Sequence, residues 1–345
     1  MARGRGGRLG VFSKGEISRL KPKVYVTRLL PKEAMERIHS SCEAKVWEGE
    51  LPPPREILLE NVVDIEGLLS LLTDKIDAEL MSRAPKLKVV SNCAVGFDNI
   101  DIQEATKRGI AVGNTPGVLT DTTADFAFAL LMAAARRVVE GDKLVRSGKW
   151  KTWGPMILLG QDVHGATLGI LGLGRIGSAV ARRAKGFGMK IIYSDVVRNK
   201  QAESELGIEY VDIDSLLARS DFITIHVNLT PETLHLIGPK QFEKMKRTMI
   251  LVNTSRGPIV DNMALYEALR SGKIAFAALD VTEPEPIPVD HPLLTLDNVI
   301  VVPHIASASV ATRTKMGLMA ADNLIAGLKG EMPPNAVNPE ALRKH

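Results

Sequence analysis

The sequence predicts an α/β protein with two doubly wound parallel-sheet domains, and three observations lead to this prediction. Short β-branched segments alternate with helix-length segments over most of the chain, which favours parallel βαβ units over hairpins. The hydrophobic character of many strands is continuous rather than alternating, as in a sheet that helices cover on both faces. A chain of 345 residues, 45% of them hydrophobic, suits two domains better than one.

Five strands are expected in the first third of the chain, at residues 23–27, 44–48, 67–72, 86–91 and 110–113. Helices fill the gaps between them, as at 102–108. A long helix is then expected to run from Thr120 or Asp121, either of which can cap it, to about Arg146. Its apolar residues recur at helical spacing, and its length suggests a spine between the two domains.

Six further strands are expected in the second half of the chain, at residues 167–172, 190–195, 222–227, 249–254, 277–281 and 299–304. Helix-length segments again separate them, so this half has the complete pattern of a doubly wound sheet. No internal repeat and no low-complexity segment follows the first 20 residues.

The net charge of +4 is concentrated at the N-terminus, so it does not predict a nucleic-acid partner. Residues 1–23 hold seven basic residues and one acidic residue, which leaves the rest of the chain slightly acidic. Residues 1–20 are rich in Gly and Arg and are expected to form a disordered basic tail. Organelle targeting or a non-specific polyanion contact is the alternative for this tail.

Neither a membrane partner nor a metal is expected. The longest apolar run, residues 126–135, is about half the length that a membrane-spanning helix needs. Cys42 and Cys93 stand 51 positions apart, without a CxxC pair or a histidine cluster at metal-ligand spacing. The sequence therefore predicts a protein of a reducing compartment, the cytoplasm, with no metal site.

A glycine-rich loop, Gly172-Leu-Gly174-Arg-Ile-Gly177, directly follows one expected strand and begins a helix expected at about 176–187. In such a loop Gly172 permits the tight turn, Gly174 lets backbone amides approach a pyrophosphate, and Gly177 lets the helix pack on the strand. The helix N-terminus adds partial positive charge. This context predicts a Rossmann dinucleotide site rather than a structural turn.

Asp195 ends the next strand, 18 residues after Gly177. A carboxylate at this place accepts hydrogen bonds from the adenosine ribose hydroxyls and repels a 2′-phosphate, which favours NAD over NADP. Arg198 follows closely and can offset part of that repulsion. NADH is therefore the expected cofactor, and NADPH stays open as an alternative.

Arg256, Glu285 and His304 each follow an expected strand, at the sheet edge where open α/β sheets bind ligands. Reduction of a 2-oxo acid needs a cation for the carboxylate, a proton donor for the ketone oxygen and a hydride for the ketone carbon. Arginine offers bidentate carboxylate recognition, and histidine can donate a proton near neutral pH. Glu285 can orient the imidazole of His304. Taken singly, each of these residues could instead have a purely structural role, such as an ion pair or a loop charge. His226, at the end of another expected strand, is a weaker candidate for a catalytic residue.

These segments resemble the D-isomer-specific 2-hydroxyacid dehydrogenase family, and the sequence looks most like its glyoxylate and hydroxypyruvate reductases. The resemblance runs from Lys21 to about Asn338 and rests on residues 94–99 (AVGFDN), 114–116 (NTP), 120–125, 172–177 (GLGRIG), 253–257 (NTSRG), 279–286 (LDVTEPEP) and 303–309 (PHIASAS). It implies a Rossmann NAD-binding domain at 114–304, inserted in a flavodoxin-like substrate domain formed by 21–113 and 305–340.

The resemblance also implies roles for single residues. An Arg, a Glu 29 positions later and a downstream His form the family's active site, which selects Arg256, Glu285 rather than Glu283, and His304 as the proton donor. Implied substrate contacts are Arg256 together with Leu72, Thr73, Ala94, Val95 and Gly96. Implied cofactor contacts are Thr123, Gly172, Gly174, Arg175, Ile176, Gly177, Asp195, Thr254 and Asp280.

By the same resemblance, the domains close around the reaction and two chains form a homodimer through the nucleotide domain. The helix at 121–146 and the arm from Trp150 to Trp153 are the expected dimer contact. Val95 stands where phosphite dehydrogenases have Lys, and Glu285 where formate dehydrogenases have a neutral amide, which disfavours both of those activities. The open alternatives are another 2-oxo acid, such as 2-ketogluconate, phosphonooxypyruvate or pyruvate, and an NAD(H)-sensing protein like the family's co-repressors.

Overall fold

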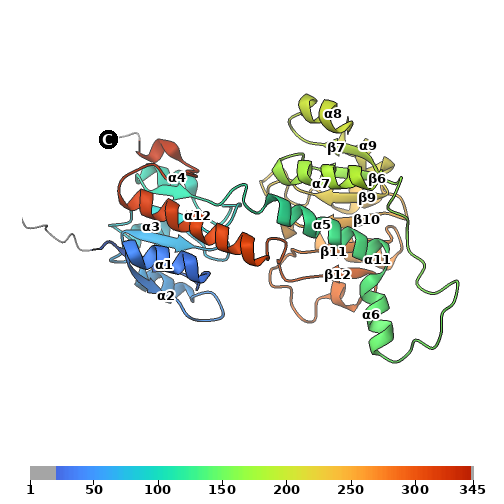
Figure 1. Ribbon diagram of the computed structural model, residues 1–345, viewed down its shortest axis with the longest axis horizontal. Coiled ribbons are helices and arrows are strands. Elements are labelled where there is room, and N and C mark those ends of the chain that lie inside the picture. The colour runs from blue at the N-terminus through green and yellow to red at the C-terminus, as the bar shows by residue number, and fades with distance from the viewer. Residues whose placement is uncertain (1–20, 343–345) are drawn as a thin grey trace, which may run out of the picture.

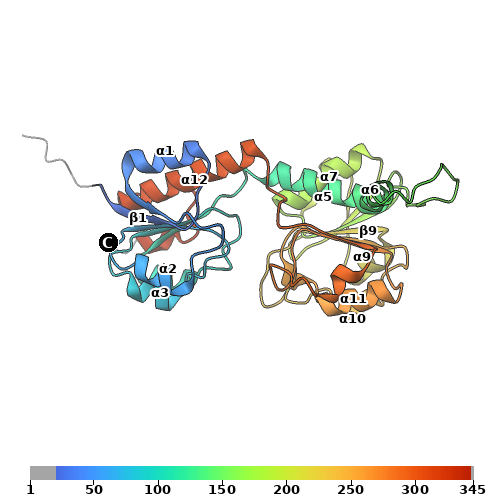
Figure 2. The same cartoon turned by 90° about the horizontal axis from the view of Figure 1, so that it is seen from below.

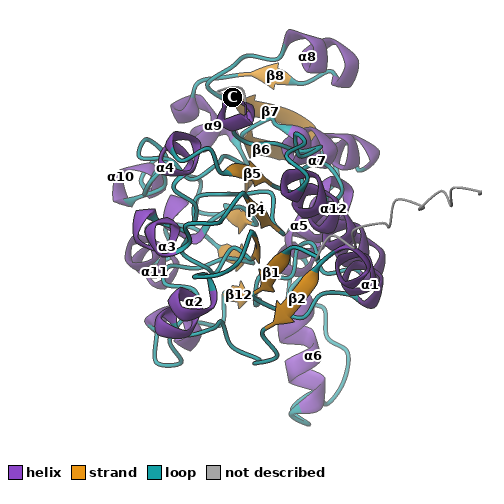
Figure 3. Cartoon of the chain, turned by 90° about the vertical axis from the view of Figure 1, so that its left-hand side faces the viewer, coloured by secondary structure: helices purple, strands orange, loops and turns teal. Residues whose placement is uncertain are grey.

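The computed structural model describes residues 21–342, which form two parallel sheets, each with helices on both faces. Figures 1 and 2 show the two domains side by side along the long axis of the molecule. Figure 3 looks along that axis and shows the strands as a middle layer between two layers of helices. The predicted fold class, two doubly wound parallel-sheet domains, is confirmed.

The first sheet has the strand order β2-β1-β3-β4-β5, which is the flavodoxin-like order. Its strands are β1 Lys23–Val26, β2 Glu43–Val46, β3 Gly67–Ser70, β4 Val89–Asn92 and β5 Ala111–Gly113. Its helices are α1 Lys32–Ser41, α2 Arg55–Asn61, α3 Ala78–Arg83, α4 Ile102–Lys107 and α12 Val310–Leu328. Helices α1 and α12 cover one face of this sheet, and α2 and α3 cover the other (Figure 2).

Helix α12 comes from the far end of the chain, yet it packs on the first sheet and on α1. The contact is close because position 317 is a glycine: a Cβ atom there would come within 2.8 Å of the Ala34 methyl group. The hydroxyl group of Ser91 in β4 also donates a hydrogen bond to the Ala320 carbonyl of α12, at 2.7 Å. The first domain is therefore completed by a helix that follows the second domain in the sequence.

The second sheet has the order β12-β11-β10-β9-β6-β7-β8, in which the chain reverses direction across the sheet between β6 and β9 as in a Rossmann fold. Its strands are β6 Thr167–Leu171, β7 Lys190–Ser194, β8 Glu209–Tyr210, β9 Phe222–Ile225, β10 Ile250–Asn253, β11 Phe276–Leu279 and β12 Val299–Val301. Its helices are α5 Thr120–Ala135, α6 Val138–Arg146, α7 Arg175–Gly186, α8 Lys200–Leu206, α9 Ile213–Arg219, α10 Pro239–Phe242 and α11 Asn262–Arg270. Short 3₁₀ helices lie at Gly257–Ile259, Pro292–Thr295 and Pro339–Leu342.

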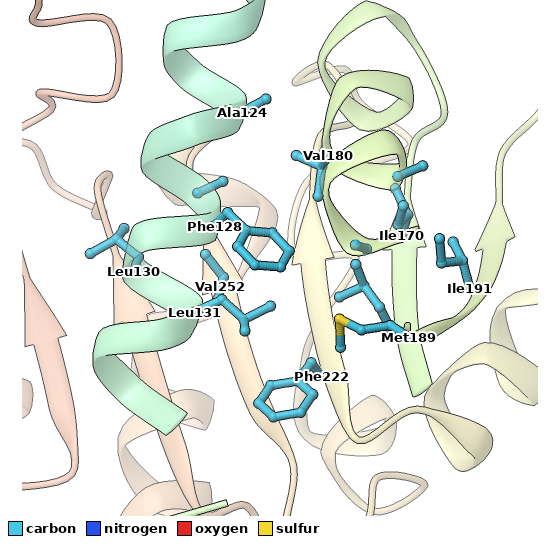
Figure 4. Packing of buried hydrophobic residues seen from close by; sticks show 14 of the residues in the cluster. Ala124, Phe128, Leu130, Leu131, Ile170, Val180, Met189, Ile191, Phe222 and Val252 are labelled. Atoms are coloured by element: carbon cyan, nitrogen blue, oxygen red, sulfur yellow. The ribbon is translucent and has the colours of Figure 1, made fainter. Parts of the chain in front are cut away.

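Helix α5 supplies much of the core on one face of the second sheet. Its sequence is rich in Ala, which has the highest helix propensity. Phe128 and Leu131 project from it toward Val180 of α7 and the underlying strands (Figure 4). Truncation of a buried Phe such as Phe128 to Ala typically costs about 3–5 kcal/mol of stability, so this layer holds the second domain together.

The prediction of one long helix from Thr120 to Arg146 is wrong. Helix α5 ends at Ala135, and Arg137 adopts a left-handed conformation with a φ of 52° before α6 begins. The carbonyl of Ala135 accepts a hydrogen bond from the amide of Gln161 at 2.8 Å, so a returning loop takes the acceptor that a continuous helix would use. The capping expectation is also wrong, because Leu119 occupies the N-cap position without a side-chain bond.

The chain crosses between the domains twice, before α5 and before α12. The hydroxyl groups of Thr122 and Thr312 lie 2.6 Å apart, which ties the first turns of these two helices together. The strands of the first sheet end at Gly113, and those of the second begin at Thr167. The domain bounds of 21–113 with 305–340, and of 114–304, stay a prediction.

Three further predictions concern the N-terminal tail, a membrane-spanning helix and a metal site. The expected basic tail, residues 1–20, lies outside the described residues. Within residues 21–342, no helix is long and apolar enough to cross a membrane. Over the same range, no group of three or more His, Cys, Asp or Glu side chains is arranged to hold a metal ion.

Candidate active site

The glycine-rich loop joins β6 to α7, and each of its three glycines meets a different spatial demand. Gly172 has a φ of 90°, and a Cβ atom there would lie 2.7 Å from the amide nitrogen of Val227. A Cβ atom at Gly177 would overlap the carbonyl oxygen of Gly172, so the helix lies directly against the loop. At Gly174, in contrast, a Cβ atom would meet no atom of the described chain within 4 Å. The loop is tight at both ends and open in the middle.

The N-terminus of α7 begins at this open position. Gly174 is its N-cap residue, and no side chain in the described range caps the helix. Its first amides are therefore free to bind an anion, and the helix dipole favours negative charge there. The side chain of Arg175 is exposed, whereas Ile176 packs against the apolar cores of both domains.

Asp195 directly follows β7 and lies beside the glycine-rich loop. Its Oδ2 accepts a hydrogen bond from the amide of Leu173 at 2.7 Å. Arg198 is paired elsewhere: its Nε and Nη2 donate to the two carboxylate oxygens of Glu203 at 2.8 and 2.7 Å. The bonds from Arg198 and from the Tyr193 hydroxyl lower the pKa of Glu203 to about 2, so this acceptor stays charged.

Three other residues were predicted to contact a cofactor. Thr254 follows β10, and its hydroxyl is buried without a hydrogen-bond partner in the described range. Thr123 is buried in the first turn of α5. Asp280 follows β11, and its carboxylate accepts hydrogen bonds from the amides of Ile305 and Ala306 at 2.7 and 2.9 Å. Burial raises the pKa of Asp280.

These features fit a dinucleotide. The open position at Gly174 and the uncapped end of α7 suit a pyrophosphate, and the Asp195 carboxylate suits a ribose. The orphaned hydroxyl of Thr254 offers a further bond at the same edge of the sheet.

His304 and Glu285 form a close pair at the carboxyl ends of β12 and β11. The Nδ1 atom of His304 lies 2.6 Å from Oε1 of Glu285. The two side chains are 24% and 35% exposed, so a small ligand can reach them. His304 has a left-handed backbone with a φ of 53°, and its amide donates to the Asp280 carbonyl at 2.9 Å. Glu283, the other glutamate of this turn, instead contacts His235 at 2.7 Å.

Arg256 lies in the loop after β10, the strand next to β11. Asn253 shapes this loop, because its side chain donates to the Arg256 carbonyl at 2.9 Å and accepts from the Ser255 amide at 3.0 Å. A Cβ atom at Gly257 would overlap Thr282, so the loop packs against the segment that carries Glu285. The described hydrogen bonds of the Arg256 side chain go to Asp98 and to the Ser255 carbonyl, not to Glu285 or His304.

The predicted substrate contacts lie in two loops of the first domain. Leu72 and Thr73 follow β3, and the segment from Ala94 to Gly96 follows β4. The amides of Ala94, Val95 and Gly96 donate to no acceptor within residues 21–342, which leaves them free to bind a carboxylate. The carbonyls of this segment are bonded, for example Val95 to the Asn114 side chain at 2.7 Å.

His226, the weaker candidate, does not join the His304–Glu285 pair. It follows β9, and its Nε2 lies 2.8 Å from the hydroxyl of Thr224. Burial lowers its pKa to about 3, so the ring is neutral near pH 7.

Asp98 is a site residue that the sequence reasoning missed. It lies in the 94–99 segment, and its carboxylate contacts Arg256 of the other domain at 3.1 Å. The signal available in the sequence was an acidic residue two positions after Gly96, in a loop expected to bind the substrate. Its partner is 158 positions away, so no local pattern could identify the pair.

The chain is similar to known proteins over more than nine-tenths of its length. The family model described as "D-isomer specific 2-hydroxyacid dehydrogenase, NAD binding domain" matches residues 128–306. A glyoxylate reductase from Korarchaeum cryptofilum is 60% identical over 325 residues, covering 94% of this chain and 98% of that protein. A solved structure from Thermus thermophilus has a TM-score of 0.87 at 46% identity, covering 91% and 99%. The NADPH-dependent glyoxylate/hydroxypyruvate reductase from Sinorhizobium meliloti has a TM-score of 0.82 at 33% identity, covering 93% and 99%.

Proposed function

The chain belongs to the D-isomer specific 2-hydroxyacid dehydrogenase family, and from this premise we propose that it reduces glyoxylate, or the related hydroxypyruvate, to the D-2-hydroxy acid with NADH. The observation that carries this proposal is the contact of 2.6 Å between His304 and Glu285 at the edge of the nucleotide-binding sheet. The name of the Korarchaeum relative supports glyoxylate as the substrate.

In the proposed reaction the chain binds a 2-oxo acid between its two domains. The guanidinium group of Arg256 and the free amides of Ala94, Val95 and Gly96 bind the carboxylate. Leu72 and Thr73 form the second wall of the substrate site. A bound nicotinamide supplies the hydride that reduces the ketone carbon.

His304 donates the proton that the ketone oxygen needs. With Nδ1 directed at Glu285, the Nε2–H of the imidazolium is the group left to face the substrate. The Glu285 carboxylate holds the ring in this orientation through its contact with Nδ1. Asp280 supports the pair, because it anchors the two amides that directly follow His304.

Three observations support NADH over NADPH. The Asp195 carboxylate lies at the glycine-rich loop, where it would accept bonds from ribose hydroxyls and repel a 2′-phosphate. Arg198, the nearby cation that could offset this repulsion, already pairs with Glu203 through two bonds. Val196 lies between them in sequence, is 99% exposed and offers no charge to a phosphate.

We further propose that two chains form a homodimer in the cytoplasm. The segment that follows α6 carries large exposed apolar side chains, of which Trp153 is 78% and Met156 76% exposed. Such a group of side chains is typical of a protein interface. Sedimentation velocity tests the assembly, and a single species at the monomer mass over the micromolar range would contradict it.

A substrate panel tests the proposed reaction. Initial rates of NADH and NADPH oxidation are measured with glyoxylate, hydroxypyruvate, 2-ketogluconate, phosphonooxypyruvate and pyruvate. The proposal predicts the highest kcat/KM for glyoxylate or hydroxypyruvate with NADH. A higher kcat/KM for another acid would reassign the substrate. Rates equal to the blank with every acid and both cofactors would favour an NAD(H)-sensing protein.

A further inference from the structure

One hydrogen-bonded ion pair joins the two domains at the candidate active site. Asp98 follows β4 of the first sheet, and Arg256 follows β10 of the second. The Nε atom of Arg256 donates to Oδ1 of Asp98 at 3.1 Å. The arginine side chain is 22% exposed and the aspartate side chain 40%, so the pair lies at a surface that a small solute can reach.

The first domain is shaped to receive this guanidinium. A Cβ atom at Gly96 would overlap Nη2 of Arg256 and would lie 2.9 Å from the Asp98 carboxylate. Any side chain at position 96 would therefore displace the arginine. The glycine leaves a notch in the 94–98 loop, and the guanidinium of the other domain occupies it.

The position of Asp98 is set by its own domain. The side chain of Asn92 donates to the Gly96 carbonyl at 3.0 Å and to Asn99 at 3.2 Å. The side chain of Asn99 donates in turn to the carbonyls of Leu71 and Asp74 at 3.0 and 2.9 Å. These bonds hold the 94–99 loop against the 71–74 loop. The carboxylate of Asp98 is thus presented on a braced loop rather than on a free one.

The pair leaves a defined edge of Arg256 for a ligand. A guanidinium has five N–H groups, and here Nε–H is bonded to Asp98 and one Nη1–H to the Ser255 carbonyl at 2.9 Å. The remaining donors are on the Nη1 and Nη2 atoms. Two of them, one on each atom, form the fork that binds a carboxylate through two parallel bonds. Asp98 therefore holds the arginine by the one nitrogen that this fork does not use.

We propose that Asp98 is a positioning residue that orients Arg256 for the carboxylate of the substrate, and that it does so from the opposite domain. This inference rests on the proposed function, in which Arg256 binds that carboxylate. The pair is already formed without a ligand, so its loss leaves the arginine side chain to be ordered when the ligand binds, which lowers the affinity by about 3- to 10-fold. A partly exposed pair contributes little to stability, so the effect falls on binding rather than on folding.

The test compares Asp98→Ala with Asp98→Asn. Oxalate, an unreactive dianion of the size of glyoxylate, is titrated against the NADH-bound protein, and its Kd is read from the fluorescence of NADH. Asp98→Ala should raise this Kd, and the KM for glyoxylate, by about 3- to 10-fold. Asp98→Asn should recover most of the loss, because its Oδ1 can accept the same bond. The Kd for NADH should stay within about twofold in both variants, since the nucleotide loop lies in the other domain.

Asp101→Ala is the matched control. Asp101 lies on the same segment, and its carboxylate caps α4 by accepting from the Glu104 amide at 2.9 Å. Loss of this cap should lower the Tm and leave the Kd for oxalate unchanged. A decrease in affinity caused only by a weakened loop would appear in the Asp101 variant as well.

A double-mutant cycle with Arg256→Lys isolates the pair. Lysine has no second nitrogen for Asp98 to hold, so Asp98→Ala should change the Kd for oxalate by less than about 1.5-fold in this background. Equal effects of Asp98→Ala in both backgrounds would overturn the inference. So would an oxalate Kd in Asp98→Ala equal to that of the unmodified protein, or equal losses in the Ala and Asn variants.

The oxalate titration separates the inference from the proposed function. If the unmodified protein binds oxalate but reduces neither glyoxylate nor hydroxypyruvate, the proposed function fails, and the comparison of the Asp98 variants still decides the positioning role. If the unmodified protein does not bind oxalate, both the carboxylate site and the role of Asp98 are refuted.

Discussion

The Nδ1 atom of His304 lies 2.6 Å from Oε1 of Glu285, although the two residues follow different strands and stand 19 positions apart. The contact arises because β11 and β12 are adjacent and parallel, so that their carboxyl ends meet at one edge. Arg256 follows β10, which pairs with β11 on its other side. The order of three neighbouring strands therefore accounts for the grouping of the three predicted catalytic residues at one edge.

Glu285→Gln should lower kcat for glyoxylate by about 10- to 100-fold and leave the Kd for NADH unchanged. The amide retains an oxygen that can accept from Nδ1 of His304, but its neutral hydrogen bond is weaker than the charge-assisted one and holds the ring less firmly. Steady-state kinetics and NADH fluorescence measure the two quantities. Glu283→Gln is the control, because Glu283 contacts His235 instead and its replacement should leave kcat within about twofold. Equal kcat values for the two variants would refute the role of Glu285.

Asp195→Ala should lower the ratio of kcat/KM with NADH to that with NADPH by about tenfold or more. Loss of the carboxylate removes acceptors for the ribose hydroxyls and the repulsion of a 2′-phosphate. Asp290→Ala, an exposed acid in the loop before the 3₁₀ helix at Pro292–Thr295, is the control and should leave the ratio unchanged. An unchanged ratio in Asp195→Ala would exclude the ribose role.

Glu203→Gln should lower the Tm by an amount that depends on pH. The bonds from Arg198 and Tyr193 lower the pKa of Glu203 from an ordinary 4.5 to about 2 in the folded protein. The ionised carboxylate therefore stabilises the folded protein at a pH above 4.5, the ordinary pKa of a glutamate in an unfolded chain. This stabilisation is lost as the pH falls toward 2. The Tm of the unmodified protein should therefore exceed that of the variant at pH 6–7, and the gap should narrow as the pH falls from about 4.5 to 3.

Glu205→Gln is the matched control for this measurement, because Glu205 lies on the same helix and accepts from the neutral amide of Gln201. A gap between the unmodified protein and Glu203→Gln that stays constant between pH 7 and 3 would show that the Arg198–Glu203 pair is not the cause.

Local patterns in the sequence were enough to predict most of the fold. Most strands of the two sheets are short segments rich in apolar residues. The spacing of Gly172, Gly174 and Gly177 with Asp195 predicted a nucleotide loop. Strand β8 was missed because it has two residues, both exposed, and lies at the edge of its sheet. The break between α5 and α6 was missed because its cause, the bond from Gln161 to Ala135, is made by a segment outside the helix.

The candidate site was predicted less directly. Position after a strand selected Arg256, Glu285 and His304, but the choice of Glu285 over Glu283 came from the spacing in a resembling family, and the comparisons confirm that family. The bond between Asp98 and Arg256 could not be predicted, because it joins two domains whose contact no periodicity encodes.

The replacement His304→Ala tests most directly the central claim, that His304 donates the proton to the ketone oxygen. The kcat for glyoxylate and the Kd for NADH are measured on the same preparation. Because a proton donor acts in the transition state, the account predicts a decrease in kcat of about 100- to 10,000-fold and a Kd for NADH within about twofold. A kcat within about threefold of the unmodified protein would contradict the account, as would equal losses in kcat and in NADH affinity.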